Sequence, residues 1–154
     1  ILGELEGVPV VAMSGRFHRY EGWGIDQIVF PVRLMHALGA RALVVSNAAG
    51  GVNPALRVGD IVVIRDHINW LGNPNLPRLE PPQGVDDRTA SAVTESIRHG
   101  AQTYDRALAE LAKRIAIEQG FDACDGTYLA TLGPNYETRS EYRMMRRMGV
   151  DVVG

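Results

Sequence analysis

The sequence predicts an α/β fold with a mixed central β-sheet flanked by helices. Short β-branched runs such as Ala42–Ser46 alternate along the chain with longer amphipathic segments such as Asp105–Gln119, and this alternation is typical of α/β proteins. The length of 154 residues suits one domain with a sizeable core. We therefore expect a single α/β domain over residues 1–154. Because the chain begins at Ile1 and stops at Gly154 directly after an apolar run, we expect this domain to be incomplete at both ends.

The predicted strands are short apolar runs rich in valine, isoleucine and leucine, with turn-forming residues nearby. Several of them have almost no polar residue in the run, which is the pattern of a strand buried inside a sheet. The expected strands are Val8–Met13, Ala42–Ser46, Asp60–Ile64, Gly126–Leu132 and Asp151–Gly154.

The predicted helices have apolar residues at helical spacing. In Phe30–Gly39 a proline stands near the start and a glycine at the end, where each is favoured. Asp105–Gln119 has one apolar face and is followed by a glycine. In Thr138–Met148 the first residue is the expected N-cap, with Glu141 at the capping-box position. The proline-rich stretch Leu71–Gln102 is predicted to be a long functional or interface loop.

Composition excludes several classes of function. The net charge of −2 and the pI of about 6.1 provide no field for binding nucleic acid or an anionic membrane. One cysteine allows no disulfide framework, and the four histidines lack ligand spacing, so we expect no metal site. The glycines of Ala49–Gly51 do not match the dinucleotide fingerprint, so we expect no nicotinamide cofactor. The absence of a signal-like start and of paired cysteines fits a reducing, cytoplasmic compartment.

The segment Gly15–Gly22 gathers groups that suit an anion and a sugar. Arg16 presents a planar fork that matches phosphate oxygens, and His18 adds a donor that can become charged near neutral pH. In an extended segment Arg16, His18 and Tyr20 would point to the same side. Glu21 is close enough in sequence to accept a hydrogen bond from His18 and orient it. The alternative is a solvated loop with scattered charge and a tyrosine that packs against it.

Ser46–Gly51 is a small-residue turn that follows a valine-rich run. In open α/β sheets, ligands bind at the carboxyl ends of the strands. Ala48 and Ala49 are small enough to let a phosphate or a flat ring approach the backbone closely. The alternative is a tight turn that needs Gly50 and Gly51 for conformational reasons alone.

Gly133–Thr138 follows another predicted strand and offers one ring and one carboxylate at the start of a helix. A purine needs a face on which to stack and an acceptor for its N1–H. Tyr136 and Glu137 could supply these two groups. The alternative for Glu137 is stabilisation of the helix N-terminus, worth about 0.3–1 kcal/mol.

These three motifs, in this order, resemble the signature segments of trimeric purine nucleoside phosphorylases, from about Val10 to Gly154. The resemblance implies a phosphorylase/hydrolase-like fold and a cytoplasmic homotrimer. It implies reversible phosphorolysis of purine (deoxy)ribonucleosides to free purine and pentose 1-phosphate. Inorganic phosphate would be a co-substrate, and no cofactor would be needed.

The resemblance also implies a role for each matching residue. Arg16, His18 and the backbone N–H of Ala48 would bind phosphate. Glu21 would support His18, and these two residues are the expected catalytic pair. Tyr20 would contact the ribose. The residues that would line the purine site are Ala49, Gly50, Tyr136 and Glu137.

Two alternatives stand beside this interpretation. A methylthioadenosine phosphorylase shares the fold, but that branch prefers Gly-x-Gly-His where this chain has Arg16-Phe17-His18. A non-catalytic, truncated remnant could instead bind purine or merely assemble. In the phosphorylases, a Ser/Gly loop and a Met-Ser-Thr run complete the pocket, and their equivalents would lie outside residues 1–154. The family also borrows a Phe from a neighbouring subunit, where this chain has Ile97.

Overall fold

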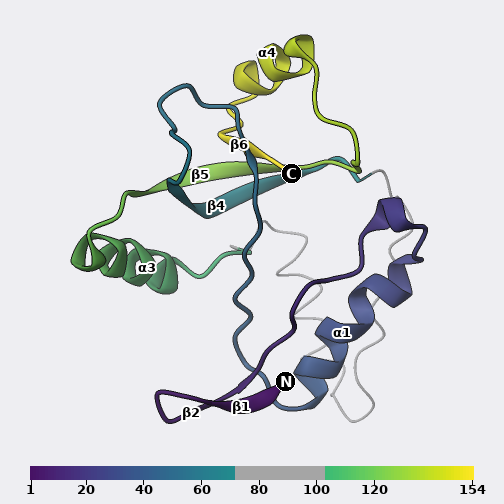
Figure 1. Cartoon of the computed structure of the whole chain (residues 1–154), viewed down its shortest axis with the longest axis vertical. Helices are drawn as coiled ribbons and strands as arrows, with labels where there is room; N and C mark the ends of the chain where they lie inside the picture. Colours follow the sequence, from purple (N-terminus) through teal and green to yellow (C-terminus); the bar gives the residue numbers. More distant parts are fainter. Residues whose placement is uncertain (72–102) are drawn as a thin grey trace, which may run out of the picture. The chain divides into compact units, whose positions relative to one another are not determined.

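A computed structural model describes residues 1–71 and 103–154 (Figure 1). The chain divides into two compact units, one of Ile1–Ala48 with Leu132–Tyr136, the other of Ala49–Thr131 with Glu137–Gly154. A single domain over residues 1–154 therefore stays a prediction. The predicted loop lies outside the described residues beyond its first residue, and Ile97 lies outside them too.

The second unit contains a four-stranded sheet, of which β4, β5 and β6 are labelled in Figure 1. Its strands are β3 (Gly50–Gly51), β4 (Ile61–Asn69), β5 (Ala123–Ala130) and β6 (Val152–Val153), in the spatial order β3-β6-β5-β4. Strands β4, β5 and β6 run parallel, whereas β3 pairs antiparallel with β6. The prediction of a mixed sheet in an α/β protein is confirmed, although β3 was expected to be only a turn.

Helix α3 (Arg106–Gln119) lies beside β4 and β5 in Figure 1 and has both of its predicted ends. The Asp105 carboxylate accepts a hydrogen bond from a first-turn backbone N–H at 2.9 Å, and Gly120 ends the helix with φ of 77°. Lys113 donates to Asp125 of β5 at 2.7 Å, which ties the helix to the sheet. None of the helices in the described residues is long and apolar enough to cross a membrane.

Helix α4 (Arg139–Arg147) begins with the predicted capping box. The Glu141 N–H donates to Thr138 Oγ1 at 3.3 Å, and the Thr138 N–H donates to the Glu141 carboxylate. Met145 on this helix is almost fully buried. It belongs to the apolar core of the second unit, which consists of Val52, Leu129, Met145, Val150 and Val153.

Asp151 joins the segments around the short central strand β6. Its carboxylate accepts from the Asn53 side-chain amide at 2.9 Å and from the Thr127 backbone N–H at 2.8 Å. Its carbonyl oxygen accepts from the backbone N–H groups of Val52 and Asn53, at 2.8 and 3.0 Å. One residue therefore satisfies donors both from the segment after β3 and from β5.

The first unit contains a β-hairpin that sequence reasoning only half predicted. Strand β2 (Val8–Val11) is shorter than the predicted Val8–Met13 and is largely exposed, so the strand is confirmed but its predicted burial is wrong. Strand β1 (Leu2–Leu5), which was not expected, pairs with it antiparallel. The two turn residues, Glu6 and Gly7, have φ of 49° and 76°. Positive φ at both positions is the geometry that two-residue hairpins favour.

Helix α1 (Ile25–Ala37) begins earlier than predicted. The expected start near Phe30 rested on Pro31, but this proline lies inside the helix. The N-terminus is formed by Gly24, whose N–H donates to the Gln27 side chain at 2.9 Å. The glycine expected at the C-terminal end is confirmed, because the chain leaves the helix with a φ of 98° at that residue, Gly39.

The predicted strand Ala42–Ser46 is wrong. No strand of residues 1–71 or 103–154 pairs with this segment, and the exposed fractions of Val44 and Val45 are 88% and 67%. The prediction rested on β-branched composition, which favours a strand only where a neighbour provides a hydrogen-bonding ladder and a surface to pack against.

Replacing Asp151 by Asn should destabilise the protein by about 1–3 kcal/mol. Each carboxylate oxygen of Asp151 accepts one hydrogen bond, from Asn53 or from Thr127, and in asparagine an NH₂ group that cannot accept would face one of these donors. Urea unfolding of both forms measures the difference. The matched control is Asp122→Asn, an exposed aspartate on the approach to β5, which should leave the unfolding midpoint nearly unchanged. Equal effects of the two substitutions would contradict the role given to Asp151.

Candidate functional site

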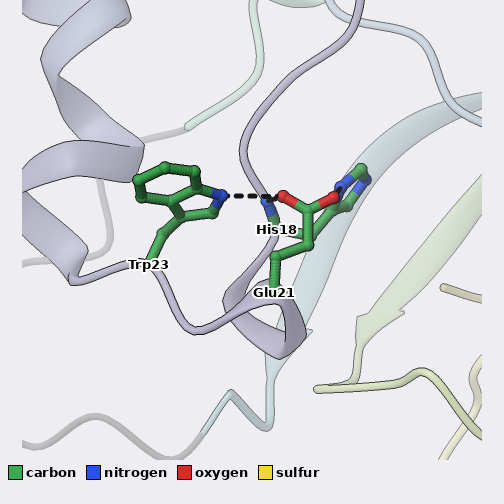
Figure 2. Close-up of polar contacts among 3 residues, drawn as sticks. All are labelled: His18, Glu21 and Trp23. Carbon is green, nitrogen blue, oxygen red and sulfur yellow. Dashed lines mark hydrogen bonds and ion pairs between the residues drawn. The ribbon is translucent and has the colours of Figure 1, made fainter.

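The Glu21 carboxylate lies at the centre of a hydrogen-bond network in the first motif (Figure 2). It accepts from the His18 backbone N–H at 3.1 Å and from the Trp23 indole N–H at 2.9 Å, both at Oε2. Its other oxygen, Oε1, lies 3.0 Å from His18 Nδ1. The short 3₁₀ turn η1 (Arg19–Glu21) brings these groups together. The prediction that Glu21 orients His18 agrees with this geometry.

These contacts occupy Nδ1 of the His18 ring and leave Nε2 available to a ligand. The hydrogen bonds from the His18 backbone and then its side chain, with that from Trp23, hold the pKa of Glu21 below its ordinary value. An ionised carboxylate only accepts hydrogen bonds, so Nδ1 carries the proton. The Nε2 atom is left to accept from a ligand when the ring is neutral, or to donate to an anion when it is charged.

Tyr20 lies next to His18, but not for the reason that was predicted. The expected alternation does not continue to Tyr20, because the chain turns into η1 after His18, whose own backbone is extended. The Tyr20 ring instead stacks on His18, with centroids 4.9 Å apart and an interplanar angle of 18°. A Cβ placed on Gly133 would lie 3.3 Å from Tyr20 Cδ1, so the third motif begins against the first.

Three other predicted residues of the first unit are not joined to this group by a contact between described residues. Arg16 is exposed and makes no hydrogen bond or ion pair in the described part of the chain. The side-chain amide of Asn47 donates to the carbonyl of Ala48 at 2.8 Å. The backbone N–H of Ala48 has no acceptor among those same residues. Tyr136 is 97% exposed. These groups are accessible to a ligand.

Gly50 has a structural requirement that the sequence did not reveal. It pairs with Val153 of β6, whereas its neighbour Ala49 lies just before the strand. A Cβ on Gly50 would lie only 2.8 Å from the hydroxyl oxygen of Tyr142 on α4. The tight-turn alternative for Gly50 is therefore wrong, because close packing and not turn conformation requires glycine here.

Glu137 does not serve as the helix cap. Thr138 and Glu141 fill that role at the start of α4, while the Glu137 carboxylate accepts from Thr131 Oγ1 at 3.3 Å. Glu137 is half-buried, so its carboxylate has little freedom to move and can still accept further hydrogen bonds.

Sequence reasoning missed Trp23 and Thr131. An indole two residues beyond Glu21 and a hydroxyl at the end of a strand were signals that could have found them.

Two surface hollows lie away from the predicted site residues. One, of about 300 Å³, is lined mainly by apolar residues after β2 and on α1, such as Met13 and Leu34. The other, of about 340 Å³, is lined by Arg143, Arg146 and Arg147. Among the described residues no group of three His, Cys, Asp or Glu side chains is placed to hold a metal ion. The site is thus defined by the chemistry of its motifs rather than by either hollow.

Comparison with known proteins places the chain in a family. Its residues 1–154 match the sequence model of the phosphorylase superfamily. The chain belongs to the phosphorylase superfamily. Purine nucleoside phosphorylase 1 of Bacillus subtilis (strain 168) is 46% identical over 155 residues, which cover 100% of this chain and 54% of that protein. Purine nucleoside phosphorylase of Mus musculus is 39% identical over 158 residues, covering 100% and 52%. The chain spans about half the length of these curated relatives.

Solved structures support the fold class. A crystal structure of Schistosoma mansoni purine nucleoside phosphorylase in complex with inosine has a TM-score of 0.78 and 40% identity, over 99% of this chain and 53% of that chain. A Schistosoma purine nucleoside phosphorylase in complex with guanosine has a TM-score of 0.78 and 39% identity, over 99% and 54%. The predicted phosphorylase-like α/β fold is confirmed.

Replacing Trp23 by Phe should raise the pKa of Glu21 toward its ordinary value of 4.5, because the carboxylate loses one donor while the ring contact with Phe17 can persist. Carboxyl-carbon NMR titration measures this pKa. Glu141 is the internal control, since its pKa is lowered by the Thr138 backbone hydrogen bond and should not move.

The sign of the pH effect follows from the same shift. The pKa of Glu21 in the folded state lies below 4.5, so its contribution to stability is present above about pH 4.5 and is lost as the pH falls through the folded pKa. A Glu21 titration identical in the wild type and in Trp23→Phe would contradict the network.

Proposed function

We propose that the whole protein is a purine nucleoside phosphorylase. It would catalyse the reversible reaction of a purine (deoxy)ribonucleoside with phosphate to give free purine and pentose 1-phosphate. The observation that carries the proposal is the network in which Glu21 fixes His18, two residues after Arg16 in the sequence, in a chain whose relatives are named purine nucleoside phosphorylases.

At the phosphate end, Arg16 offers a planar fork and His18 offers Nε2, while the Ala48 N–H supplies a backbone donor. Glu21 holds the His18 ring through Nδ1 and compensates its charge when the ring is protonated. The bound phosphate attacks the anomeric carbon as the glycosidic C–N bond breaks. Its negative charge stabilises the positive charge that develops on the sugar.

At the purine end, Glu137 accepts from N1–H of a 6-oxopurine, and from the 2-amino group of guanine as well. Tyr136 presents an exposed ring on which the base can stack. Tyr20 stacks on His18, and in the proposal its hydroxyl is the group that contacts the ribose. The electron pair of the glycosidic bond leaves with the purine, and hydrogen bonds to the polar edge of the base stabilise the negative charge that develops until water supplies a proton.

Other features of the proposal follow from the resemblance to the family. Inorganic phosphate is a co-substrate and no cofactor takes part. The assembly is a homotrimer in the cytoplasm. Complexes of related Schistosoma enzymes with inosine, adenosine and guanosine support purine nucleosides as substrates.

Replacing His18 by Ala in the whole protein should lower kcat/KM for phosphate. The loss of transition-state stabilisation should be about 1.5–3 kcal/mol, the contribution of one charge-assisted hydrogen bond. Steady-state kinetics with phosphate varied at saturating inosine measure it. His36→Ala is the control, an exposed histidine at the end of α1 that has no proposed role. Unchanged phosphate kinetics in the His18 variant would remove His18 from the site.

Replacing Glu137 by Gln should weaken the use of both guanosine and inosine, by about 1–3 kcal/mol in kcat/KM, because the amide turns a donor toward the N1–H. Guanosine should lose more, since its 2-amino contact is lost as well. Phosphorolysis followed by release of free base compares the two, with the exposed Glu118→Gln as the control. If adenosine is the better substrate of the unmutated protein, this assignment is wrong.

A further inference from the structure

Tyr142 is a residue of α4 to which neither the motifs nor the proposed chemistry assigns a role. Its backbone N–H donates to the Thr138 carbonyl at 3.0 Å, so it lies one turn after the helix cap. Its half-buried ring packs against the core cluster that includes Leu129 and Met145. A phenol held in this way has little freedom to swing aside.

The hydroxyl of Tyr142 reaches the strand that carries Gly50. The three atoms nearest to a Cβ built on Gly50 are the Tyr142 hydroxyl oxygen at 2.8 Å, Val153 Cγ1 at 3.4 Å and the Val153 carbonyl oxygen at 3.7 Å. No ring carbon of Tyr142 is therefore closer than 3.7 Å, and the hydroxyl alone causes the conflict. The neighbouring Gly51 is different, because its Cβ would meet only Leu56 Cβ, at 3.9 Å.

The same helix begins directly after Glu137. Thr138 caps α4 and Tyr142 follows four residues later, a rise of about 6 Å along the axis. One capped helix thus links Glu137 at its entrance to the backbone of Ala49–Gly50 beneath Tyr142. These are two of the elements proposed to line the purine.

We infer that Tyr142 is a positioning residue for the purine: its hydroxyl sets the position of the Ala49–Gly50 backbone relative to Glu137. The inference rests on the proposed phosphorylase function and extends it to a residue that does not touch substrate. A shift of this backbone changes the fit of the base. Of the three proposed phosphate donors, Arg16 and His18 belong to another segment, and only the Ala48 N–H adjoins the shifted backbone. A misplacement of about 1 Å can cost 10²-fold in rate.

The test compares Gly50→Ala with the double variant Gly50→Ala/Tyr142→Phe in the whole protein. Inosine KM is measured at saturating phosphate, and phosphate KM at saturating inosine. Gly50→Ala should raise the inosine KM about tenfold, the ratio that corresponds to 1.4 kcal/mol of overpacking, and leave the phosphate KM within about twofold. Removing the Tyr142 hydroxyl in the double variant should bring the inosine KM most of the way back to the wild-type value. Gly51→Ala is the matched control and should behave like the wild type.

Thermal unfolding of each variant checks that it is folded. If Gly50→Ala does not fold, Tyr142→Leu is measured in its place. Leucine keeps the apolar packing but no longer reaches Gly50. In this variant the KM for inosine should rise and the KM for phosphate should not. Failure of Tyr142→Phe to rescue Gly50→Ala, or an equal rise in both KM values, would overturn the role of Tyr142 alone. Lack of turnover by the unmutated protein would instead reject the phosphorylase proposal and this inference with it.

Discussion

The second unit depends on the hydrogen bonds that Asp151 makes at the entrance to β6. This central strand has two residues, too few for its own ladder to hold it between β3 and β5. Asp151 adds side-chain and backbone bonds to Asn53 on one side and to Thr127 on the other. Because partly buried polar groups must be paired, these bonds fix where β6 lies as well as how tightly it is held.

The position of β6 then determines the purine-binding side of the proposed site. Val153 pairs with Gly50 and belongs to the core against which Tyr142 packs. The next residue, Gly154, accepts from the Thr131 N–H at 2.9 Å, and Thr131 in turn donates its hydroxyl to Glu137. A short strand therefore connects the glycine and the carboxylate proposed for the base, although more than 80 residues separate them in the sequence.

What could be predicted from the sequence was local. The caps of α3 and α4 are set by residues within one turn, and the His18–Glu21 contact spans three residues. Predictions that needed a partner elsewhere in the chain were less successful. Ala42–Ser46 has the composition of a strand but no described strand beside it. Pro31 is typical of a helix start, yet the helix had already begun at Ile25.

Gly50 shows why the site could be only half predicted. A glycine in a ligand-binding motif is commonly interpreted as giving the ligand access to the backbone. Here a Cβ would lie only 2.8 Å from the Tyr142 hydroxyl oxygen, so packing disfavours a side chain before a ligand is considered. Packing and binding therefore impose the same residue for different reasons, and sequence alone cannot separate them. The phosphate side is less ambiguous at Arg16, because this exposed guanidinium has no hydrogen bond or ion pair among the described residues and contributes little to packing. Its position is explained more directly by the phosphate that we propose it binds.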